Sequence, residues 1–134
     1  MNFIKTTSYS LIVLSYMAKH EDRKMSASFL HEELHMPYSY LRYILHILSK
    51  NGFITGTTGR NGGFVFSRDI DEIYLADIVE ATEGLDSFKR CVMGFSECPL
   101  NEKCAMHKIW EKTRTRILRV LTKTSLADLM KKGQ

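Results

Sequence analysis

The sequence lacks any apolar stretch long enough to cross a membrane. Its longest uncharged run, from Thr6 to Ala18, contains polar residues and falls short of the roughly 20 apolar residues that a spanning helix needs. No convincing signal-peptide cleavage site follows that run. We therefore expect a cytoplasmic protein that has no membrane partner. With 134 residues, of which 44% are hydrophobic and 25% charged, the chain is long enough for one folded core.

Cysteines are few, and all three lie between Cys91 and His107. A reducing compartment argues against a stable disulfide, and an odd number would leave one thiol over. A thiol enzyme would need a cysteine held near a base, or a C-x-x-C pair, together with further catalytic residues. The sequence shows no such pair and no second catalytic motif, so we do not expect an enzyme.

Acidic side chains are absent from residues 34–68, which carry Arg42, Lys50, Arg60 and Arg68. The segments before and after hold equal numbers of acidic and basic side chains, so the net charge of +4 comes from this stretch alone. Such a surface suits a polyanion, because each Lys or Arg attracts phosphate and no carboxylate repels it. The same composition also describes an ordinary basic surface, and charge alone does not separate the two interpretations.

Apolar spacing predicts two short helices joined by a tight turn. Ser26 is a candidate N-cap for a helix over Ala27 to His35, and Met36-Pro37 breaks that helix. A second helix starts at Ser39 and ends at Gly52. Its spacing gives a buried face of Leu41, Ile44, Leu45 and Leu48, and an outer face of Ser39, Arg42, Tyr43 and His46. This pair is typical of a helix-turn-helix.

A β-hairpin is predicted directly after the helix pair. Phe53 to Thr57 and Phe64 to Ser67 are rich in aromatic and β-branched residues, and TGRNGG between them supplies turn residues and one charge. A helix-turn-helix followed by a hairpin with a basic tip is a winged helix, which indicates DNA binding. The expected fold is mostly α-helical with this small hairpin. Residues expected to contact DNA are Ser39, Tyr40, Arg42 and Tyr43 in the groove and Arg60 at the wing.

Helices at the two ends of the chain carry further apolar surface. Thr6 to His20 is apolar on nearly every side, so we expect it to be buried. A helix over Leu75 to Glu83 comes later, and Ser125 with Asp128 resembles a capping box for a last short helix. The longest helix runs from Ala105 to about Thr122, with a stripe of Met106, Ile109, Trp110, Thr113, Ile117, Val120 and Leu121. That stripe fits either a second copy of the chain or the first helix of the same chain.

The cysteines and the histidine that follows them have the spacing C-x6-C-x5-C-x2-H among polar neighbours. Free structural cysteines prefer apolar surroundings, whereas Cys91, Cys98, Cys104 and His107 form a soft set of metal ligands. Structural zinc sites bring their ligands in close pairs, and the wider gaps here suit an iron-sulfur cluster better. The residues therefore favour an iron-sulfur cluster, with structural zinc as the alternative.

The order of these parts resembles that of the bacterial winged-helix iron-sulfur transcription regulators typified by IscR and NsrR. The likeness spans the whole chain and rests on SYLRYILHILSKNGFI, TGRNGGF, IYLADIVEATEG, the loop from Cys91 to His107, and SLADLM. It implies a repressor or dual regulator that binds a partly palindromic operator in double-stranded DNA as a homodimer. The implied parts are a winged-helix DNA-binding domain over 1–84, a cluster loop over 85–104, and a dimerisation helix with a C-terminal helix over 105–134.

The resemblance also implies roles for individual residues. Cys91, Cys98 and Cys104 would be cluster ligands, and His107 resembles the histidine that completes a 2Fe-2S site in IscR-type members. In NsrR-type members an Asp of the other subunit completes a 4Fe-4S site, and Ser8 at the matching position is a poor ligand. This favours 2Fe-2S over 4Fe-4S. DNA binding would then respond to cluster status, redox state, nitric oxide or iron.

Overall fold

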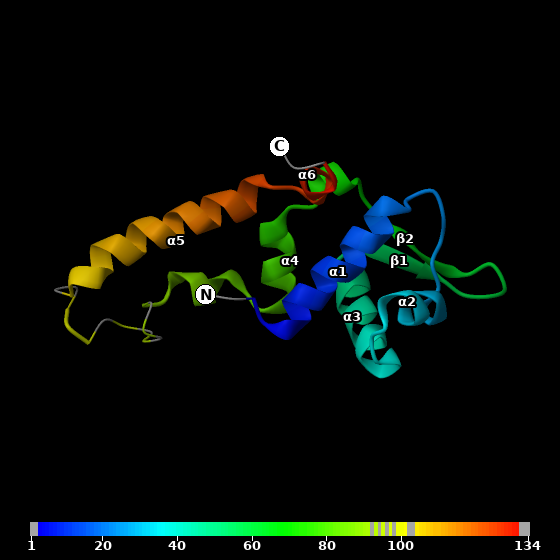
Figure 1. Ribbon diagram of the computed structural model, residues 1–134, viewed down its shortest axis with the longest axis horizontal. Helices are drawn as coiled ribbons and strands as arrows, with labels where there is room; N and C mark the ends of the chain where they lie inside the picture. Colours follow the sequence, from blue (N-terminus) through cyan, green and yellow to red (C-terminus); the bar gives the residue numbers. More distant parts are fainter. Residues whose placement is uncertain are drawn as a thin grey trace.

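The computed structural model describes residues 3–91, 93, 95, 97, 99–101 and 104–131 (Figure 1). Its helices are α1 (Lys5–Lys19), α2 (Ala27–Leu34), α3 (Tyr38–Lys50), α4 (Leu75–Thr82), α5 (Ala105–Lys123) and α6 (Leu126–Met130). It also contains the strands β1 (Ile54–Thr57) and β2 (Gly63–Phe66), and the 3-10 helices η1 (Ile70–Glu72) and η2 (Leu85–Lys89). The predicted fold class, mostly helical with a small hairpin, is confirmed. None of the described helices is long and apolar enough to cross a membrane.

Helices α2 and α3 form the predicted helix-turn-helix. The Ser26 hydroxyl caps α2 by accepting a hydrogen bond from the Phe29 N–H at 3.1 Å. His35 ends α2 in the left-handed region, with φ 54°, a conformation that histidine adopts more often than most residues. Pro37 then leads into α3, which starts at Tyr38, one residue earlier than predicted, because proline's fixed φ suits a helix entrance. The predicted buried face of α3 is confirmed: Leu41, Ile44, Leu45 and Leu48.

Strands β1 and β2 form the predicted wing, an antiparallel hairpin in which Ile54 lies opposite Phe66. A third segment pairs with it, which the sequence did not indicate. Met25 and Phe64 exchange two backbone hydrogen bonds, of 3.2 and 2.8 Å. At Gly63 a Cβ would come within 3.0 Å of the Met25 backbone, and φ is 152°, so only glycine allows this approach without strain. The wing is therefore joined to the segment that leads into α2.

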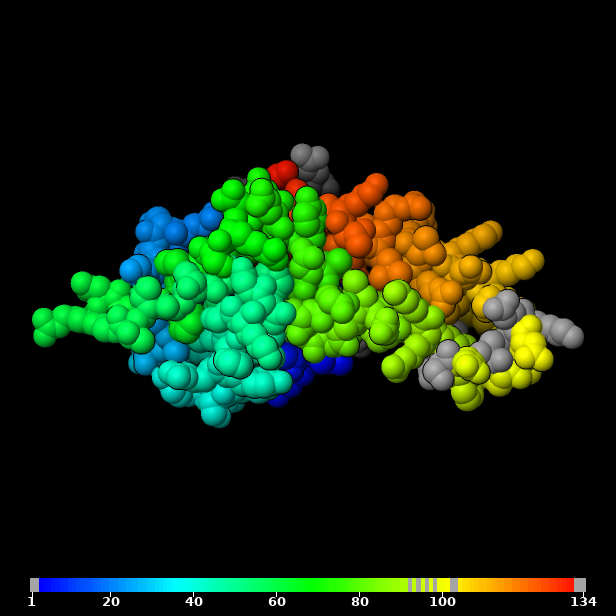
Figure 2. All heavy atoms as spheres, turned by 180° about the vertical axis from the view of Figure 1, so that it is seen from behind, coloured from blue at the N-terminus to red at the C-terminus, as the bar shows by residue number. Residues whose placement is uncertain are grey.

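The apolar residues form two cores. The larger lies among α1, α2, α3, the wing, α4 and α6, and includes Leu14, Leu30, Leu41, Phe53, Ile78 and Leu126. The smaller lies among α4, η2 and α5, and consists of Ala76, Val79, Phe88 and Leu121. Figures 1 and 2 show the wing and α5 projecting from opposite ends of the molecule. Helix α5 thus packs on the winged helix chiefly through the smaller core, and its last residues lead into α6.

The two end helices are less buried than the sequence suggested. Helix α1 packs one face into the larger core and leaves Ile12 45% exposed. Helix α5 packs chiefly against α4 and η2, not against α1. Its predicted stripe is split in two, because Ile117 and Leu121 turn toward the smaller core. The other part is exposed to solvent: Met106, Ile109 and Val120.

Helix α6 begins with the predicted capping box. The Ser125 hydroxyl accepts from the Asp128 N–H at 3.1 Å, and the Asp128 carboxylate accepts from the Ser125 N–H at 2.9 Å. The bond from the Ser125 backbone, followed by the bond from Lys131, holds the pKa of Asp128 below its usual value. The Leu126 N–H donates to the Ile73 carbonyl at 2.7 Å. The last helix is therefore fastened beside the start of α4.

Glu83, at the end of α4, ties that helix to the start of α1. Its Oε2 atom accepts from the Ile4 N–H at 3.0 Å and from the Thr7 hydroxyl at 2.6 Å. Thr7 is fully buried, and its oxygen lies 2.6 Å from the Thr82 hydroxyl. The Thr82 hydroxyl also donates to the Ile78 carbonyl at 2.8 Å, so the side-chain oxygens of Thr7, Thr82 and Glu83 form one polar cluster between α1 and α4. Ile4 has no polar side chain with which to cap α1, so Glu83 satisfies a backbone donor there.

Replacing Thr7 with valine should lower the free energy of unfolding by about 1.5–3 kcal/mol, since the change removes the hydrogen bond that the buried Thr7 hydroxyl donates to the Glu83 carboxylate. Urea unfolding followed by circular dichroism measures this as a lower midpoint at an unchanged slope. Thr7→Ser keeps the hydroxyl and is the matched control. A valine variant as stable as the serine variant would contradict the role given to this hydroxyl.

Candidate nucleic-acid interface and cysteine segment

The outer face of α3 presents a polar stripe to solvent. Ser39, Arg42, Tyr43 and His46 are all exposed. No carboxylate occurs anywhere in residues 34–68, so nothing in this part of the chain repels phosphate. Hydroxyl, guanidinium and imidazole groups at a helix surface can exchange hydrogen bonds with the base edges of a major groove. The structure thus places Ser39, Arg42 and Tyr43 where an incoming duplex can reach them.

Tyr40 lies apart from this stripe, on the side of α3 that faces α1. Its hydroxyl is 2.9 Å from the Thr6 hydroxyl. Its ring packs edge-on against Tyr9, with the centroids 5.7 Å apart. This partly buried position makes Tyr40 a link between the two helices. Its predicted contact with DNA stays a prediction, and its present contacts favour a structural role.

Lys5 brings a positive charge from α1 to the same end of α3. Its Nζ atom lies 5.5 Å from the ring centroid of Tyr9 and 5.4 Å from that of Tyr40. Sequence reasoning missed Lys5, because only the packing of α1 on α3 brings the two helix ends together. We regard Lys5 as a further candidate for a phosphate contact.

A groove of about 560 Å³ runs between α3 and the wing. Tyr38, Arg42 and His46 line it from α3, at the i, i+4, i+8 spacing of one helix edge. The wing lines the other side through residues 56–59 and 62–64, and residues 26–28 line the end at α2. The sequence analysis did not single out Tyr38 as lining this groove, although its spacing from Arg42 is the signal that could have found it.

Arg60 lies at the tip of the wing, between β1 and β2, and is exposed. The hairpin carries it away from the body of the molecule (Figure 1). None of the ion pairs found within the described ranges involves Arg60 or Arg42. Both guanidinium groups are therefore available to a phosphate or a base edge.

Two of the predicted metal ligands flank the cysteine segment. Cys91 and Cys104 are both free thiols and both half-buried. The Cys91 N–H donates to the Phe95 carbonyl at 3.1 Å, which turns the chain back after η2. Cys104 is the N-cap residue of α5, and the His107 N–H donates to its carbonyl at 3.0 Å. Cys98, the remaining predicted ligand, lies outside the described residues.

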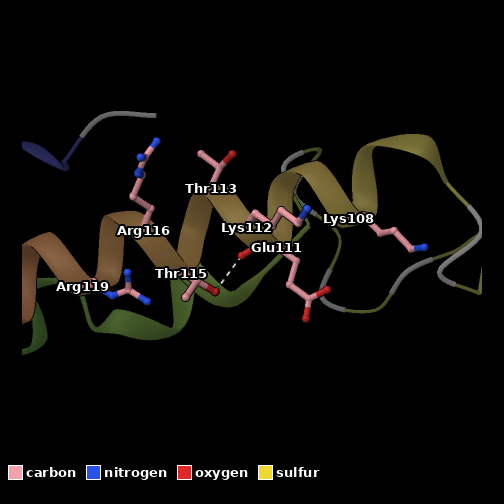
Figure 3. A pocket seen from close by; sticks show the side chains of 7 residues that line it. All are labelled: Lys108, Glu111, Lys112, Thr113, Thr115, Arg116 and Arg119. Carbon is pink, nitrogen blue, oxygen red and sulfur yellow. Dashed lines mark hydrogen bonds between the residues drawn. The ribbon is translucent and has the colours of Figure 1, made fainter.

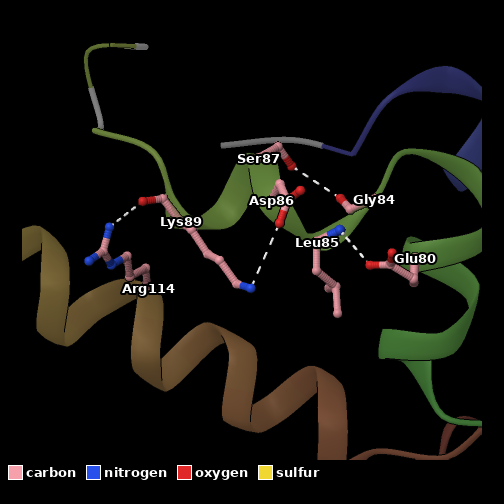
Figure 4. Close-up of polar contacts among 7 residues, drawn as sticks. All are labelled: Glu80, Gly84, Leu85, Asp86, Ser87, Lys89 and Arg114. Carbon is pink, nitrogen blue, oxygen red and sulfur yellow. Dashed lines mark hydrogen bonds and ion pairs between the residues drawn. The ribbon is translucent and has the colours of Figure 1, made fainter. Parts of the chain in front are cut away.

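Side chains of α5 hold the backbone that leads to Cys91. The Trp110 Nε1–H donates to the Arg90 carbonyl at 2.5 Å. The Arg114 guanidinium donates to the Lys89 carbonyl (Figure 4). Both acceptors come directly before Cys91 in the chain. The backbone that leads into Cys91 is therefore held against α5 near Trp110 and Arg114.

The other end of η2 is fastened to α4. The Glu80 carboxylate accepts from the Leu85 N–H at 2.9 Å, and the Ser87 hydroxyl donates to the Gly84 carbonyl at 3.4 Å (Figure 4). Phe88 is 3% exposed in the smaller core. Hydrogen bonds thus hold residues 84–91 to α4 at one end and to α5 at the other, so this segment connects the two helices. The sequence had predicted a loop here.

The donor atoms around the start of α5 suit a soft or borderline metal. Two thiols and an imidazole favour iron-sulfur clusters or zinc over magnesium or calcium, which prefer oxygen ligands. His107 Nε2 lies 3.8 Å from a carboxylate oxygen of Glu111. Within the part of the chain that the structure describes, no three His, Cys, Asp or Glu side chains converge to hold a metal ion. The donor chemistry fits the predicted classes of metal centre.

A row of cations runs along the side of α5 that faces away from Leu121 and the smaller core. The row borders a broad concave surface of about 830 Å³, lined by Lys108, Glu111, Lys112, Thr113, Thr115, Arg116 and Arg119 (Figure 3). Figure 3 shows the long basic side chains extending outward from the helix. Helix α5 therefore has three faces: one in the smaller core, one exposed and apolar, and one basic.

Comparison with known proteins identifies relatives of the chain. Residues 3–132 match the family model Rrf2, described as iron-dependent transcriptional regulator. Protein rrf2 of Nitratidesulfovibrio vulgaris is 26% identical over 132 residues, 98% of this chain and 88% of the relative. The HTH-type transcriptional regulator IscR of Xenorhabdus nematophila is 31% identical over 93 residues, 69% of this chain and 56% of the relative.

Solved structures support the fold. The structure of CymR, the global cysteine regulator of B. subtilis, matches with a TM-score of 0.79 at 23% identity, over 96% of this chain and 95% of CymR. The matched family consists of transcriptional regulators, so the expectation of a DNA-binding regulator rather than an enzyme is confirmed.

Trp110→Phe should loosen the backbone before Cys91, because it keeps an aromatic ring but removes the N–H that binds the Arg90 carbonyl. One such hydrogen bond is worth about 0.5–1.5 kcal/mol, so Cys91 should open to solvent about 2- to 12-fold more often. Alkylation of the reduced, metal-free protein by iodoacetamide, read by mass spectrometry, measures this. Cys104, which caps α5, is the internal control. Equal alkylation of Cys91 in both proteins would rule out the fastening role.

Proposed function

The chain belongs to the Rrf2 family of iron-dependent transcriptional regulators, and from that premise we propose that it binds operator DNA as a homodimer under the control of an iron-sulfur cluster. The observation that carries this proposal is that Cys91, just after η2, and Cys104, the N-cap residue of α5, are both free, half-buried thiols. They lie at the connection between the winged helix and the long helix. The proposed division is a DNA-binding domain over 1–84, a cluster loop over 85–104, and a dimerisation part over 105–134.

The proposed ligands are Cys91, Cys98, Cys104 and His107, which would hold a 2Fe-2S cluster. Cys104, the N-cap residue, and His107, in the first turn, stand three residues apart at one end of α5. The contacts of Trp110 and Arg114 hold the backbone just before Cys91 against the same helix. When bound, the cluster would supply iron–thiolate bonds that are sensitive to oxidants, nitric oxide and iron supply.

Two copies of the chain are proposed to pair through α5. Its exposed apolar row, Met106, Ile109 and Val120, has no cover within the described part of the chain. Each of these side chains is at least 43% exposed, and burying them against the same row of a second copy would remove apolar surface from water. The pairing would place two winged helices on one duplex, as a partly palindromic operator requires.

The connection over residues 84–91 is proposed to carry the signal. Glu80 holds it from α4, and Trp110 and Arg114 hold it from α5. When the proposed cluster is bound to its ligands, it would fix the ends of this connection and so set the angle between α4 and α5. Two recognition helices must meet half-sites about 34 Å apart, so a small change in this angle alters the fit. Coupling of this kind is typically worth about 1–3 kcal/mol, or about 5- to 150-fold in affinity.

Protein purified without oxygen should contain iron and sulfide and absorb visible light. His107→Ala should change the absorbance spectrum and shorten the lifetime of the cofactor in air, because the ligand set loses its imidazole. His107→Cys offers a replacement thiolate and is the matched control. Absorbance and metal analysis measure the outcome. Colourless protein containing zinc would favour a structural zinc site, and protein without iron or zinc would overturn the metal-control proposal.

Arg60→Ala should weaken binding to operator and non-operator duplexes alike. It should also lower the slope of log affinity against log salt concentration by the amount that corresponds to about one phosphate contact per wing, because the wing tip loses its charge. Fluorescence anisotropy at several salt concentrations measures both effects. Lys131→Ala removes the same charge from the end of α6, which does not line the groove, and should change neither. An unchanged affinity and salt slope in Arg60→Ala would remove the wing from the interface.

A further inference from the structure

We propose that Tyr38 is a positioning residue for base recognition: its ring, braced by His31, holds the guanidinium of Arg42 so that Arg42 presents its N–H groups to guanine. This inference rests on the proposed binding of operator DNA and specifies which base the groove reads. Arg42 is the residue that touches the base. Tyr38 acts through Arg42.

Three side chains lie in a row at the edge of the groove. The Arg42 guanidinium carbon lies 5.9 Å from the ring centroid of Tyr38, one helical turn before it. The rings of Tyr38 and His31 meet edge to face, with centroids 5.6 Å apart and an angle of 81° between their planes. Both Tyr38 and Arg42 line the groove between α3 and the wing.

His31 is fixed in turn by the helix-turn-helix itself. Its Nδ1 atom hydrogen-bonds to the carbonyl of Met36, in the turn between α2 and α3. A carbonyl only accepts, so Nδ1 carries the proton and the ring orientation is set. Met36 is 2% exposed, which anchors the acceptor in the larger core. The Tyr38 ring therefore rests on a residue whose position is determined by the fold.

Tyr38 is the partner that orients Arg42 in this structure. No ion pair among the described residues involves Arg42, and residues 34–68 contain no carboxylate. An exposed arginine without a partner samples many rotamers, and binding must then immobilise it. A cation–π contact with an aromatic ring restricts the guanidinium before DNA arrives and leaves N–H groups available for a base.

The lining of the groove selects guanine among the four bases. Arginine binds guanine O6 and N7 in a bidentate manner, the commonest specific contact in the major groove. Adenine is usually read by Asn or Gln, and cytosine by Asp or Glu. None of those residue types occurs among the described residues that line this groove. Arg42 is the only lining residue there with a planar, bidentate donor.

The experiment uses the full-length protein, purified without oxygen. Wild-type protein first selects duplexes from a randomised pool, which defines an operator. Titrations with the Arg42→Ala variant then identify the guanine that Arg42 reads. At that position a change to adenine weakens binding by the wild type but not by the variant. Anisotropy titrations with the operator and its guanine-to-adenine version give the discrimination at that position, which should be about 5- to 150-fold in the wild type.

Tyr38→Leu should lower this discrimination by about 3- to 10-fold while affinity for a non-operator duplex, its salt slope and the thermal midpoint stay unchanged. Tyr38→Phe keeps the ring and should behave like the wild type. His31→Leu removes the brace and should give a smaller loss in the same direction. In an Arg42→Ala background, Tyr38→Leu should have no further effect, because Tyr38 acts through Arg42.

Three results would overturn the inference. Arg42→Ala could leave every guanine preference intact, or Tyr38→Phe could lose as much discrimination as Tyr38→Leu. A further loss from Tyr38→Leu in the Arg42→Ala background would show that Tyr38 touches the DNA itself. Each of these leaves operator binding standing. Wild-type protein that selects no consensus sequence would instead overturn operator binding, and this inference with it.

Discussion

The carboxylate of Glu83 is the interaction on which the arrangement of the molecule depends. It accepts from the Ile4 N–H and the Thr7 hydroxyl, so the start of α1 and the end of α4 are held at one point. Gly84 follows directly, with φ 80°, and turns the chain into η2 and the cysteine segment. The winged helix and the connection to α5 are therefore fixed by the same few hydrogen bonds. A displacement of η2 would therefore strain the hydrogen bonds between Glu83 and the start of α1.

Much of the winged helix was predictable because its signals are local. Ser26 caps α2, the apolar spacing of α3 gives its buried face, and the glycines of the wing permit its turn. The pairing of Met25 with Phe64 was not predictable, since the two residues are far apart in the sequence and pair through backbone atoms alone. The division of the α5 stripe likewise depends on where α4 and η2 lie, and helical spacing does not report that.

The candidate site was predictable to a similar extent. Helical spacing placed Arg42 on an outer face, and the lack of acidic residues around it indicated a polyanion. Helical spacing did not distinguish Tyr40, which turns toward α1, from the residues of α3 that line the groove. The bonds from Trp110 and Arg114 to main-chain carbonyls leave no pattern in the sequence either. The full ligand set stays a prediction, because Cys98 lies outside the described residues.

The backbone pairing of Met25 with Phe64 has a mechanical consequence. It attaches the hairpin to the stretch that enters α2, while the packing of α2 on α3 attaches that stretch to the recognition helix. The hairpin, the segment around Met25 and the helices α2 and α3 are therefore expected to move as one rigid unit. A tilt transmitted along α5 would move this whole unit, so its contacts with the major groove and with the DNA backbone would be gained or lost together.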